Sequence, residues 1–399
     1  MASTAIKNEE GKKEYFDPPD VLEAKVEQLA LWIQESSHFI AFTGAGISTS
    51  AGIQDFRSGY NTVLQTGPGV WEKQAQKKKS TKPVVRKEMI KALPSPTHMA
   101  FVQLERAGFL KFLVSQNIDG LHRKSGVPPS GLSELHGNTN LEKCKKCRKE
   151  YMRDFRTRNN PKVHEHDTGR MCDNPACRGK LHDTIINFGE NLDSTVMNRA
   201  FENAAMADLC LAMGSSLRVT PAADIPELTS RRGKLVIVNL QKTPLDDSAH
   251  LVIHAFCDTV MGMVMEKLGL PVPEFRLTRR LKISKILEAP RGCKEMSECL
   301  YFQGIDVDRC PFSLFPQIEV RKKNVSHKLR REPMKVYEKK FQGAYTVIMH
   351  FQRHYSEPSL SVDIVPERIP VGGFLVLTMD YNPFTKTWGE VQRSVNNSN

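Results

Sequence analysis

The segment at positions 41–57 joins an apolar run to two glycines and a series of small hydroxyl residues. The run at positions 38–42 has the length of a buried parallel strand. Gly44 and Gly46 carry no side chain, so the backbone can turn sharply there and approach a phosphate group, whose charge the N–H groups of a following helix start can satisfy. Five residues separate Gly52 from Gly46, where the common dinucleotide fingerprint has two. A tight strand-to-helix turn without a ligand therefore stays open as the alternative.

Three further apolar runs end in short polar sequences, as the first one does. They begin at Leu110, Leu209 and Lys234 and end in Ser-Gln-Asn, Gly-Ser-Ser and Asn-Leu-Gln, and segments of helical period lie at 20–35, 96–106 and 198–208. This alternation predicts an α/β fold with a doubly wound parallel sheet, in which ligands bind outside the carboxyl ends of the strands. The four polar endings are therefore expected to meet at one crevice, which favours a dinucleotide as the ligand.

The chain has 399 residues, enough for a sizeable core and at least one further domain. No run of about 18 apolar residues occurs, and residues 1–20 are charged and polar, so we expect neither a membrane span nor a secretion signal. In the intracellular protein that this predicts, nine cysteines indicate reduced thiols or metal ligands rather than a disulfide framework. The net charge of +12 is compatible with an acidic partner but does not identify one.

Two close pairs of cysteines lie between the second and third of these strands. Two residues separate Cys144 from Cys147 and four separate Cys172 from Cys177, in a charged region with little apolar periodicity. Four thiolates on turns give the tetrahedral coordination that zinc prefers, and such a site can stabilise a module too small for its own core. We expect structural zinc on the four cysteines, with no open position for catalysis. Reduced thiols without metal, or a ligand from the two histidines of segment 164–166, are the alternatives.

The character of the sequence changes after residue 274. Residues 275–340 hold 17 Lys or Arg residues against 8 Asp or Glu residues, a surplus of nine. The clusters Arg321-Lys-Lys323 and Lys328-Leu-Arg-Arg331 resemble a nuclear import signal or a nucleic-acid contact, and a solvated basic face is the alternative. Runs at 345–351, 360–365 and 374–379 alternate or are apolar and predict a β-rich extension.

Three short polar groups follow the expected strand ends or lie near them. They are residues 116–122 (Gln-Asn-Ile-Asp-Gly-Leu-His), 135–138 (Leu-His-Gly-Asn) and 187–190 (Asn-Phe-Gly-Glu). None is specific alone, and a single histidine such as His136 is more often structural than catalytic. In this order, after the glycine turn and with the cysteine pairs following His136, they resemble the sirtuin family of NAD-dependent protein deacylases over about residues 20–273. The similarity is greatest to the nuclear subgroup of mammalian sirtuins six and seven.

The resemblance implies a Rossmann-like core for residues 20–273 that binds NAD, a zinc-binding module inserted at 137–184, an N-terminal tail at 1–19 and a C-terminal extension at 274–399. The implied catalytic residues are His136, as general base, with Asn117 and Asp119. The implied cofactor-binding residues are Gly44, Ala45, Gly46, Thr49, Asp55, Phe56, Arg57, Trp71, Gln116, Asn117, Asp119, Gly214, Ser215, Ser216, Asn239, Leu240, Gln241 and Cys257. The substrate peptide would lie as an extra strand beside Phe188, Gly189, Glu190 and Val219.

Two features depart from the family pattern. Gln54 stands where proline is usual, and the stretch at 58–68 is longer than expected for the subgroup. Both lie in the segment that would close over the cofactor, so the preferred acyl group is left open.

The resemblance implies an NAD-dependent protein lysine deacylase that forms nicotinamide and O-acyl-ADP-ribose, with zinc as a structural metal. We expect it in the nucleus, acting on histones or other nuclear proteins, with DNA or RNA bound by the basic C-terminal region and no membrane partner. The alternatives are a protein mono-ADP-ribosyltransferase, or a chromatin-bound NAD-sensing scaffold with little catalysis.

Overall fold

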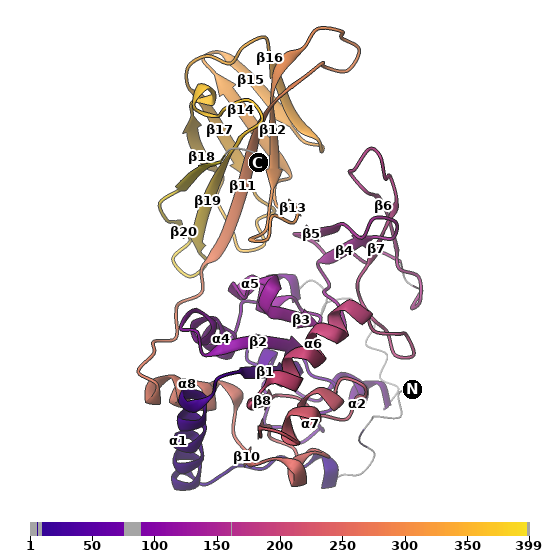
Figure 1. The fold of residues 1–399 in the computed structure, drawn as a ribbon, viewed down its shortest axis with the longest axis vertical. Helices are drawn as coiled ribbons and strands as arrows, with labels where there is room; N and C mark the ends of the chain where they lie inside the picture. The colour runs from indigo at the N-terminus through magenta and orange to yellow at the C-terminus, as the bar shows by residue number, and fades with distance from the viewer. Residues whose placement is uncertain (1–5, 7–9, 76–88, 161, 397–399) are drawn as a thin grey trace. The chain divides into compact units, whose positions relative to one another are not determined.

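The computed structural model describes residues 6, 10–75, 89–160 and 162–396, which form two compact units (Figure 1). The first, here called the core unit, consists of residues up to 139 together with 160–166 and 183–275. The second, the sandwich unit, consists of 140–159, 167–182 and the residues from 276 onward.

The core unit is built on a six-stranded parallel sheet with strand order β10-β9-β8-β1-β2-β3. The chain proceeds from β1 through β2 to β3, returns to the other side of β1, and continues through β8 and β9 to β10. This order confirms the doubly wound sheet that the sequence predicts. The strands are β1 (Phe39–Thr43), β2 (Leu110–Ser115), β3 (Leu132–Glu134), β8 (Leu209–Met213), β9 (Lys234–Val238) and β10 (Leu251–Ile253). The sequence does not reveal β3 and β10, because three residues are too few to establish a period.

Helices cover both faces of this sheet because its strands are apolar on both sides. In β1, Phe39 and Ala41 pack with α1, α4 and α8, whereas Ile40 and Phe42 pack with α6 and α7. The helices are α1 (Pro19–Glu35), α2 (Val70–Ala75), α4 (Pro96–Arg106), α5 (Leu121–Ser125), α6 (Ser194–Met206), α7 (Asp224–Ser230) and α8 (Cys257–Lys267). Among the described helices, none has both the length and the apolar character that crossing a bilayer requires.

A second sheet lies in the sandwich unit. It joins residues 140–159 and 167–182, here called the cysteine segment because they hold the four predicted zinc ligands, to the C-terminal extension. Its strand order is β13-β5-β4-β7-β6. The strands are β4 (Leu141–Cys144), β5 (Glu150–Arg153), β6 (Asp167–Met171), β7 (Lys180–Asp183) and β13 (Phe312–Ser313). The edge strand β13 comes from the extension and pairs in parallel with β5, with Phe312 opposite Met152. The backbone N–H of Met152 also donates to the carbonyl of Pro311 at 2.8 Å.

The rest of the C-terminal extension forms two antiparallel sheets, which confirms its predicted β-rich character. One has the order β16-β12-β11-β19-β20 with β21 on β19, and the other has the order β15-β14-β17-β18. Their strands are β11 (Leu277–Glu288), β12 (Ser297–Gly304), β14 (Gln317–Lys322), β15 (Val325–Leu329), β16 (Met334–Glu338), β17 (Tyr345–His350), β18 (Leu360–Ile364), β19 (Phe374–Asn382), β20 (Thr387–Trp388) and β21 (Gln392–Asn396). Side chains of both sheets, such as Ile283, Val320, Val347 and Leu377, belong to one buried core, so the two sheets form a β-sandwich.

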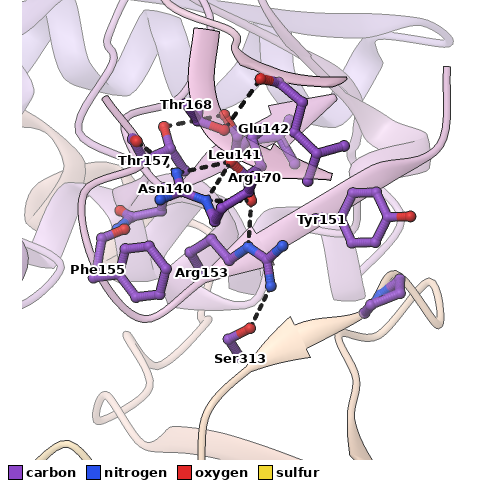
Figure 2. Close-up of polar contacts among 12 residues, drawn as sticks. Asn140, Leu141, Glu142, Tyr151, Arg153, Phe155, Thr157, Thr168, Arg170 and Ser313 are labelled. Atoms are coloured by element: carbon purple, nitrogen blue, oxygen red, sulfur yellow. Dashed lines mark hydrogen bonds and ion pairs between the residues drawn. The ribbon is translucent and has the colours of Figure 1, made fainter. Parts of the chain in front are cut away.

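Polar contacts between the cysteine segment and β13 accompany the strand pairing (Figure 2). The Nε atom of Arg153 donates to the buried carboxylate of Glu142 at 2.6 Å, and its Nη1 atom donates to the hydroxyl of Ser313. Arg170 donates from Nε to the same carboxylate at 2.8 Å. A side chain of the extension therefore completes the hydrogen bonding of a buried charge network in the cysteine segment.

A second buried charge connects the same two parts of the sandwich unit. Arg279 of β11 is 3% exposed, and its Nη2 atom donates to Asp154 at 3.2 Å and to Glu357 at 2.7 Å. Removing one member of such a group leaves an uncompensated charge in the interior, at a cost of about 3–5 kcal/mol. The cysteine segment and the sandwich are therefore expected to stabilise each other.

Candidate active site

The carboxyl ends of β1, β2, β8 and β9 open into one cleft of about 970 Å³ in the core unit. Every residue that the resemblance assigns to the catalytic, cofactor-binding and substrate-binding sets lines this cleft. They are Gly44, Ala45, Gly46 and Thr49 after β1; Asp55, Phe56, Arg57 and Trp71; Gln116, Asn117 and Asp119 after β2; His136; Phe188, Gly189 and Glu190; Gly214, Ser215, Ser216 and Val219 after β8; Asn239, Leu240 and Gln241 after β9; and Cys257 at the start of α8. Strand endings far apart in the sequence thus surround one space.

Gly44 and Gly46 lie where the turn after β1 meets the turn after β8. A Cβ atom on Gly44 would lie 2.6 Å from the carbonyl oxygen of Gly214, and one on Gly46 would lie 2.6 Å from the Cα atom of Gly214. The N–H of Gly46 donates to that carbonyl at 2.8 Å. The contact between the two turns therefore requires both glycines even without a ligand. This packing requirement adds to the close approach of the backbone to a phosphate, for which glycine is expected from the sequence.

Ser48 connects two of the predicted catalytic residues. Its hydroxyl donates to Asp119 Oδ2 at 2.7 Å and accepts from Asn117 Nδ2 at 3.3 Å. The same amide group donates to the carbonyl of Gly44 at 3.0 Å, and all three side chains are buried. The turn after β1 therefore fixes the side chains after β2. The sequence does not predict this role for Ser48, because a serine in a run of small hydroxyl residues gives no specific signal.

His136 is oriented by the backbone of the segment after β2. Its Nδ1 atom lies 2.8 Å from the carbonyl oxygen of Gln116, and a carbonyl only accepts, so Nδ1 carries the proton and Nε2 is left as an acceptor. Burial lowers the pKa of His136, the nearby charge of Arg57 lowers it further, and the bond to Gln116 opposes both. The imidazole is therefore neutral near pH 7 and can accept a proton.

Arg57 brings positive charge to the cleft, and a second arginine, Arg218, lies near it in the chain's fold. Burial and the charge of Arg218 lower the pKa of Arg57 to about 10, and the guanidinium of Arg57 lies 4.3 Å from the ring centroid of Trp71. A pyrophosphate group in the cleft would offset the repulsion between the two cations and accept hydrogen bonds from Arg57. The sequence does not predict this neighbour of Arg57, because Arg218 follows the Gly-Ser-Ser ending outside any recognised motif.

Within the part of the chain that the structure describes, the carboxylate of Asp55 has one oxygen that is hydrogen-bonded and one that is not. Its Oδ2 atom accepts from the backbone N–H of Arg57 at 3.2 Å, and from the N–H and hydroxyl of Ser58 at 3.0 and 2.8 Å. Its Oδ1 atom is buried and has no hydrogen-bond partner among the described residues. Burial raises the pKa of Asp55, and the bonds from Ser58 and Arg57 oppose this. A buried acceptor in a cation-bearing cleft fits a ligand with both hydroxyl and phosphate groups.

The two features that depart from the family pattern contact each other. The amide Nε2 of Gln54 donates to the carbonyl of Thr66 at 3.3 Å and to that of Pro68 at 2.5 Å. Glu14, from the N-terminal segment, accepts from the hydroxyl of Thr62 at 2.7 Å and from the N–H of Val63 at 2.9 Å. Both side chains therefore hold the long stretch at 58–68, and the sequence predicts neither as a site residue.

A row of aromatic rings joins the cofactor side of the cleft to the predicted substrate side. The ring centroid of Trp71 lies 5.8 Å from that of Phe56 and 5.6 Å from that of Phe188. Phe188 is 55% exposed, and Gly189 after it has a φ of +89°, which a side chain would strain. The turn at 187–190 that presents Phe188 therefore requires glycine at its third position.

The four cysteines of the sandwich unit form a compact cluster. Their Sγ atoms all lie within 4.8 Å of one another, with Cys144 and Cys177 3.6 Å apart and Cys147 and Cys172 also 3.6 Å apart. Tetrahedral zinc with Zn–S bonds of about 2.3 Å requires separations of about 3.8 Å, so the donor set fits zinc. The histidines of segment 164–166 contact Glu190 instead, so the alternative that a histidine replaces a cysteine is not supported.

Comparison with known proteins places these features in a family. The sequence model of the Sir2 family matches residues 44–221. NAD-dependent protein deacetylase SRT1 of Arabidopsis thaliana is 45% identical over 270 residues, which cover 66% of this chain and 54% of that protein. Human NAD-dependent protein deacetylase sirtuin-7 is 41% identical over 277 residues, which cover 66% of this chain and 65% of that protein. NAD-dependent protein deacetylase Sirt6 of Drosophila melanogaster is 37% identical over 274 residues, which cover 66% of this chain and 82% of that protein.

The solved structure described as Sir2 bound to acetylated peptide is 29% identical, with a TM-score of 0.46, and the match covers 62% of this chain and 100% of that one. The chain spans 54% of the Arabidopsis relative and 65% of the human one, so it corresponds to part of their length. The family assignment rests on the sequence matches, which confirm the resemblance drawn from the motifs. The chain belongs to the Sir2 family, the sirtuins.

Proposed function

We propose that this chain is an NAD-dependent protein lysine deacylase. The observation that carries the proposal is the position of His136, which is neutral near pH 7, has Nε2 as its acceptor, and lines the same cleft as the glycine turn, Asn117 and Asp119. The SRT1, sirtuin-7 and Sirt6 relatives are each named NAD-dependent protein deacetylases, which supports the same conclusion.

In this proposal NAD supplies, when bound, a ribose whose bond to nicotinamide can be broken and whose hydroxyl groups can receive an acyl group. The turn after Gly44, with the backbone N–H of Ala45, and the guanidinium of Arg57 hold the pyrophosphate. Asp55 accepts a hydrogen bond from a sugar hydroxyl through Oδ1, and Phe56 excludes water from the reacting centre. His136 takes a proton from a ribose hydroxyl through Nε2, while the carbonyl of Gln116 keeps the ring in the required tautomer.

The proposed reaction is tested by incubating the protein with NAD and histone peptides that carry short-chain or long-chain acyl-lysine. We expect nicotinamide and O-acyl-ADP-ribose in equal amounts, detected by mass spectrometry. Label from the adenosine of NAD that becomes attached to protein would indicate mono-ADP-ribosyl transfer instead. Binding of NAD without either product would indicate the NAD-sensing scaffold.

Gln54→Ala and Glu14→Ala are each expected to raise the KM for NAD about tenfold, with little change of kcat at saturating NAD. Each substitution removes hydrogen bonds worth on the order of 1 kcal/mol from the stretch at 58–68, which lines the cofactor side of the cleft. Initial rates measured against NAD concentration test this. Glu10→Ala is the matched control, because Glu10 contacts Tyr15 and not this stretch. Equal KM values in all four proteins would contradict the prediction.

We also propose that the protein acts in the nucleus on histones or other nuclear proteins, and that its basic hairpin contacts DNA or RNA. The predicted basic clusters lie at the β14–β15 hairpin and just after it. Neighbouring acids pair with some of these cations: Arg321 with Glu319 at 2.7 Å and Lys322 with Glu338 at 3.2 Å. Lys323, Lys328 and Arg331 are exposed, so these three cations are the ones best placed to contact phosphate groups.

Reversing the charge of Lys323, Lys328 and Arg331 together, each to Glu, is expected to weaken DNA binding and its salt dependence. Each phosphate that a cation no longer neutralises lowers the slope of log K against log salt concentration by about 0.9, so the slope for the triple variant should be smaller by roughly 2–3. Fluorescence anisotropy with a labelled duplex between low and physiological salt measures this. The matched control reverses the exposed Lys91, Lys111 and Arg232 of the core unit, and equal binding by both variants would contradict a role for the hairpin.

A further inference from the structure

The turn formed by residues 187–190 is held by one carboxylate that four groups share. The Oε2 atom of Glu190 accepts from the backbone N–H of Asn187 at 2.6 Å and from its amide Nδ2 at 2.9 Å. The Oε1 atom lies 2.7 Å from His164 Nδ1 and 3.0 Å from His166 Nε2. Each oxygen therefore has two partners, Oε2 within the turn and Oε1 in a segment more than twenty residues earlier in the chain.

His166 is placed between two carboxylates. Its Nε2 atom faces Glu190, and its Nδ1 atom lies 3.2 Å from Asp183 Oδ1. A neutral imidazole can donate through only one nitrogen, so hydrogen bonds to carboxylates on both sides require the doubly protonated ring. Burial lowers the pKa of His166, but the hydrogen bonds to Glu190 and Asp183 outweigh it, so that the pKa is raised above 6.5.

The same segment reaches the edge of the cleft. Asn187 Nδ2 donates to the carbonyl of Val163 at 2.8 Å, and the side chains of Val163 and Phe188 both line the cleft. They are 58% and 55% exposed, so they form part of its open rim. Phe188 also contacts Trp71. A change in the hydrogen bonding of Glu190 would therefore move the rim on which an incoming peptide would lie.

We propose that Glu190, His164 and His166 form a clamp that fixes the 187–190 turn, and that they are positioning residues for the acyl-lysine peptide and not for NAD. This inference rests on the proposed deacylase function and adds to it a set of side chains that govern affinity for one of the two substrates. The segment at 163–166 supplies the two histidines of the clamp, so it belongs functionally to the substrate side of the cleft although it lies in the sequence between the two cysteine pairs.

The clamp has a pH dependence whose direction follows from the groups that face each other. His166 faces Glu190 and Asp183, and Glu190 faces His164 and His166. The pKa of Glu190 is lowered to about 2, because hydrogen bonds from Asn187 and the two histidines outweigh its burial, so this carboxylate stays charged. The raised pKa of His166 means that the clamp is complete below pH 6.5 and weakens as the pH rises through that raised value. The KM for peptide should therefore rise with pH.

Steady-state kinetics test the proposal with an acetyl-lysine peptide that contains no group titrating between pH 6 and 9. At pH 6.5, Glu190→Gln and His166→Gln are expected to raise the KM for peptide about tenfold, the loss expected for charge-assisted hydrogen bonds, with the KM for NAD within about twofold of wild type. His164→Gln, at an exposed position, should give a smaller rise. Glu165→Gln is the matched control, since Glu165 lies between the two histidines and is not part of the clamp. In the His166→Gln protein the rise of KM with pH should disappear. Unchanged KM values, or equal increases for peptide and NAD, would overturn the proposal.

Amide hydrogen exchange separates this inference from the proposed function. The amides of residues 187–190 are expected to exchange faster in the Glu190→Gln protein than in wild type or the Glu165→Gln control. If wild type shows no NAD-dependent turnover, the proposed function fails, but the exchange result still decides whether the clamp exists. Equal exchange in all three proteins would refute the clamp even if wild type is an active deacylase.

Discussion

The His136→Ala protein is expected to release nicotinamide from NAD and form O-acyl-ADP-ribose about 10²- to 10⁴-fold more slowly than wild type, the usual effect of removing a general base. The reason is geometric, since Nε2 of His136 is the acceptor left over when Nδ1 bonds to the carbonyl of Gln116. Alanine removes the acceptor and leaves the glycine turn, Asn117 and Asp119 in place. Measurement requires saturating NAD and acyl-peptide, with both products quantified.

The pH dependence of the reaction rate tests the role of His136 in a second way. Because burial lowers the pKa of His136, its neutral form persists below pH 6.5, and the rate should fall only at a more acidic pH. This acidic decline should be absent from the residual activity of the His136→Ala protein. His327→Ala, which changes an exposed histidine of β15, is the control and should match wild type. Full activity of His136→Ala, with zinc content and circular dichroism unchanged, would remove His136 from the mechanism.

Loss of zinc is expected to destabilise the whole sandwich unit and not only the cysteine segment. Structural zinc contributes about 10–16 kcal/mol in small zinc-finger peptides, so Cys144→Ser should unfold the sheet that contains β4 and β5. Asp154 would then no longer face the buried Arg279, and leaving that charge unpaired costs about 3–5 kcal/mol by itself. The β-sandwich should therefore unfold at lower temperature or lower denaturant concentration.

Hydrogen exchange resolved by peptide measures this effect separately in β11, β12 and β19. Cys293→Ser serves as the control because Cys293 is exposed in the same unit and lies outside the cluster. Arg279→Met tests the connection without touching the metal ligands and should also accelerate exchange in these strands. Protection of β11 and β19 that is unaffected by zinc loss would show that the sandwich is stable on its own.

The sequence predicts the sheet of the core unit and the residues around the cleft for the same physical reason. Parallel strands buried on both faces appear as continuous apolar runs, and their carboxyl ends must lie at one edge. A residue that directly follows such a run, such as Asn117 or Ser215, can therefore be placed without coordinates. Residues whose role depends on a contact from elsewhere in the chain cannot be placed in this way. Glu14 contacts a loop almost fifty residues later, and Gln54 contacts carbonyls near the end of the long stretch at 58–68.

The first strands of the sandwich are likewise not predicted from the sequence, and β11 shows why. Its inward positions alternate regularly, but they include Arg279 and Lys285, which are 3% and 5% exposed, so the pattern of apolar residues is broken. Both charges are acceptable inside because they have acidic partners, Lys285 with Glu298 at 3.1 Å. No local rule predicts such a partner. The parallel pairing of β13 with β5 likewise joins positions about 160 residues apart.

The pairing of β13 with β5 affects what happens when the chain is shortened. A polypeptide that ends near residue 275 would keep the residues of the cleft but would lack β13, so β5 would become an open sheet edge with unpaired N–H and C=O groups. Exposed edges of this kind recruit strands from other molecules. Such a fragment would be prone to self-association through its metal-binding sheet, whatever the state of its nucleotide cleft.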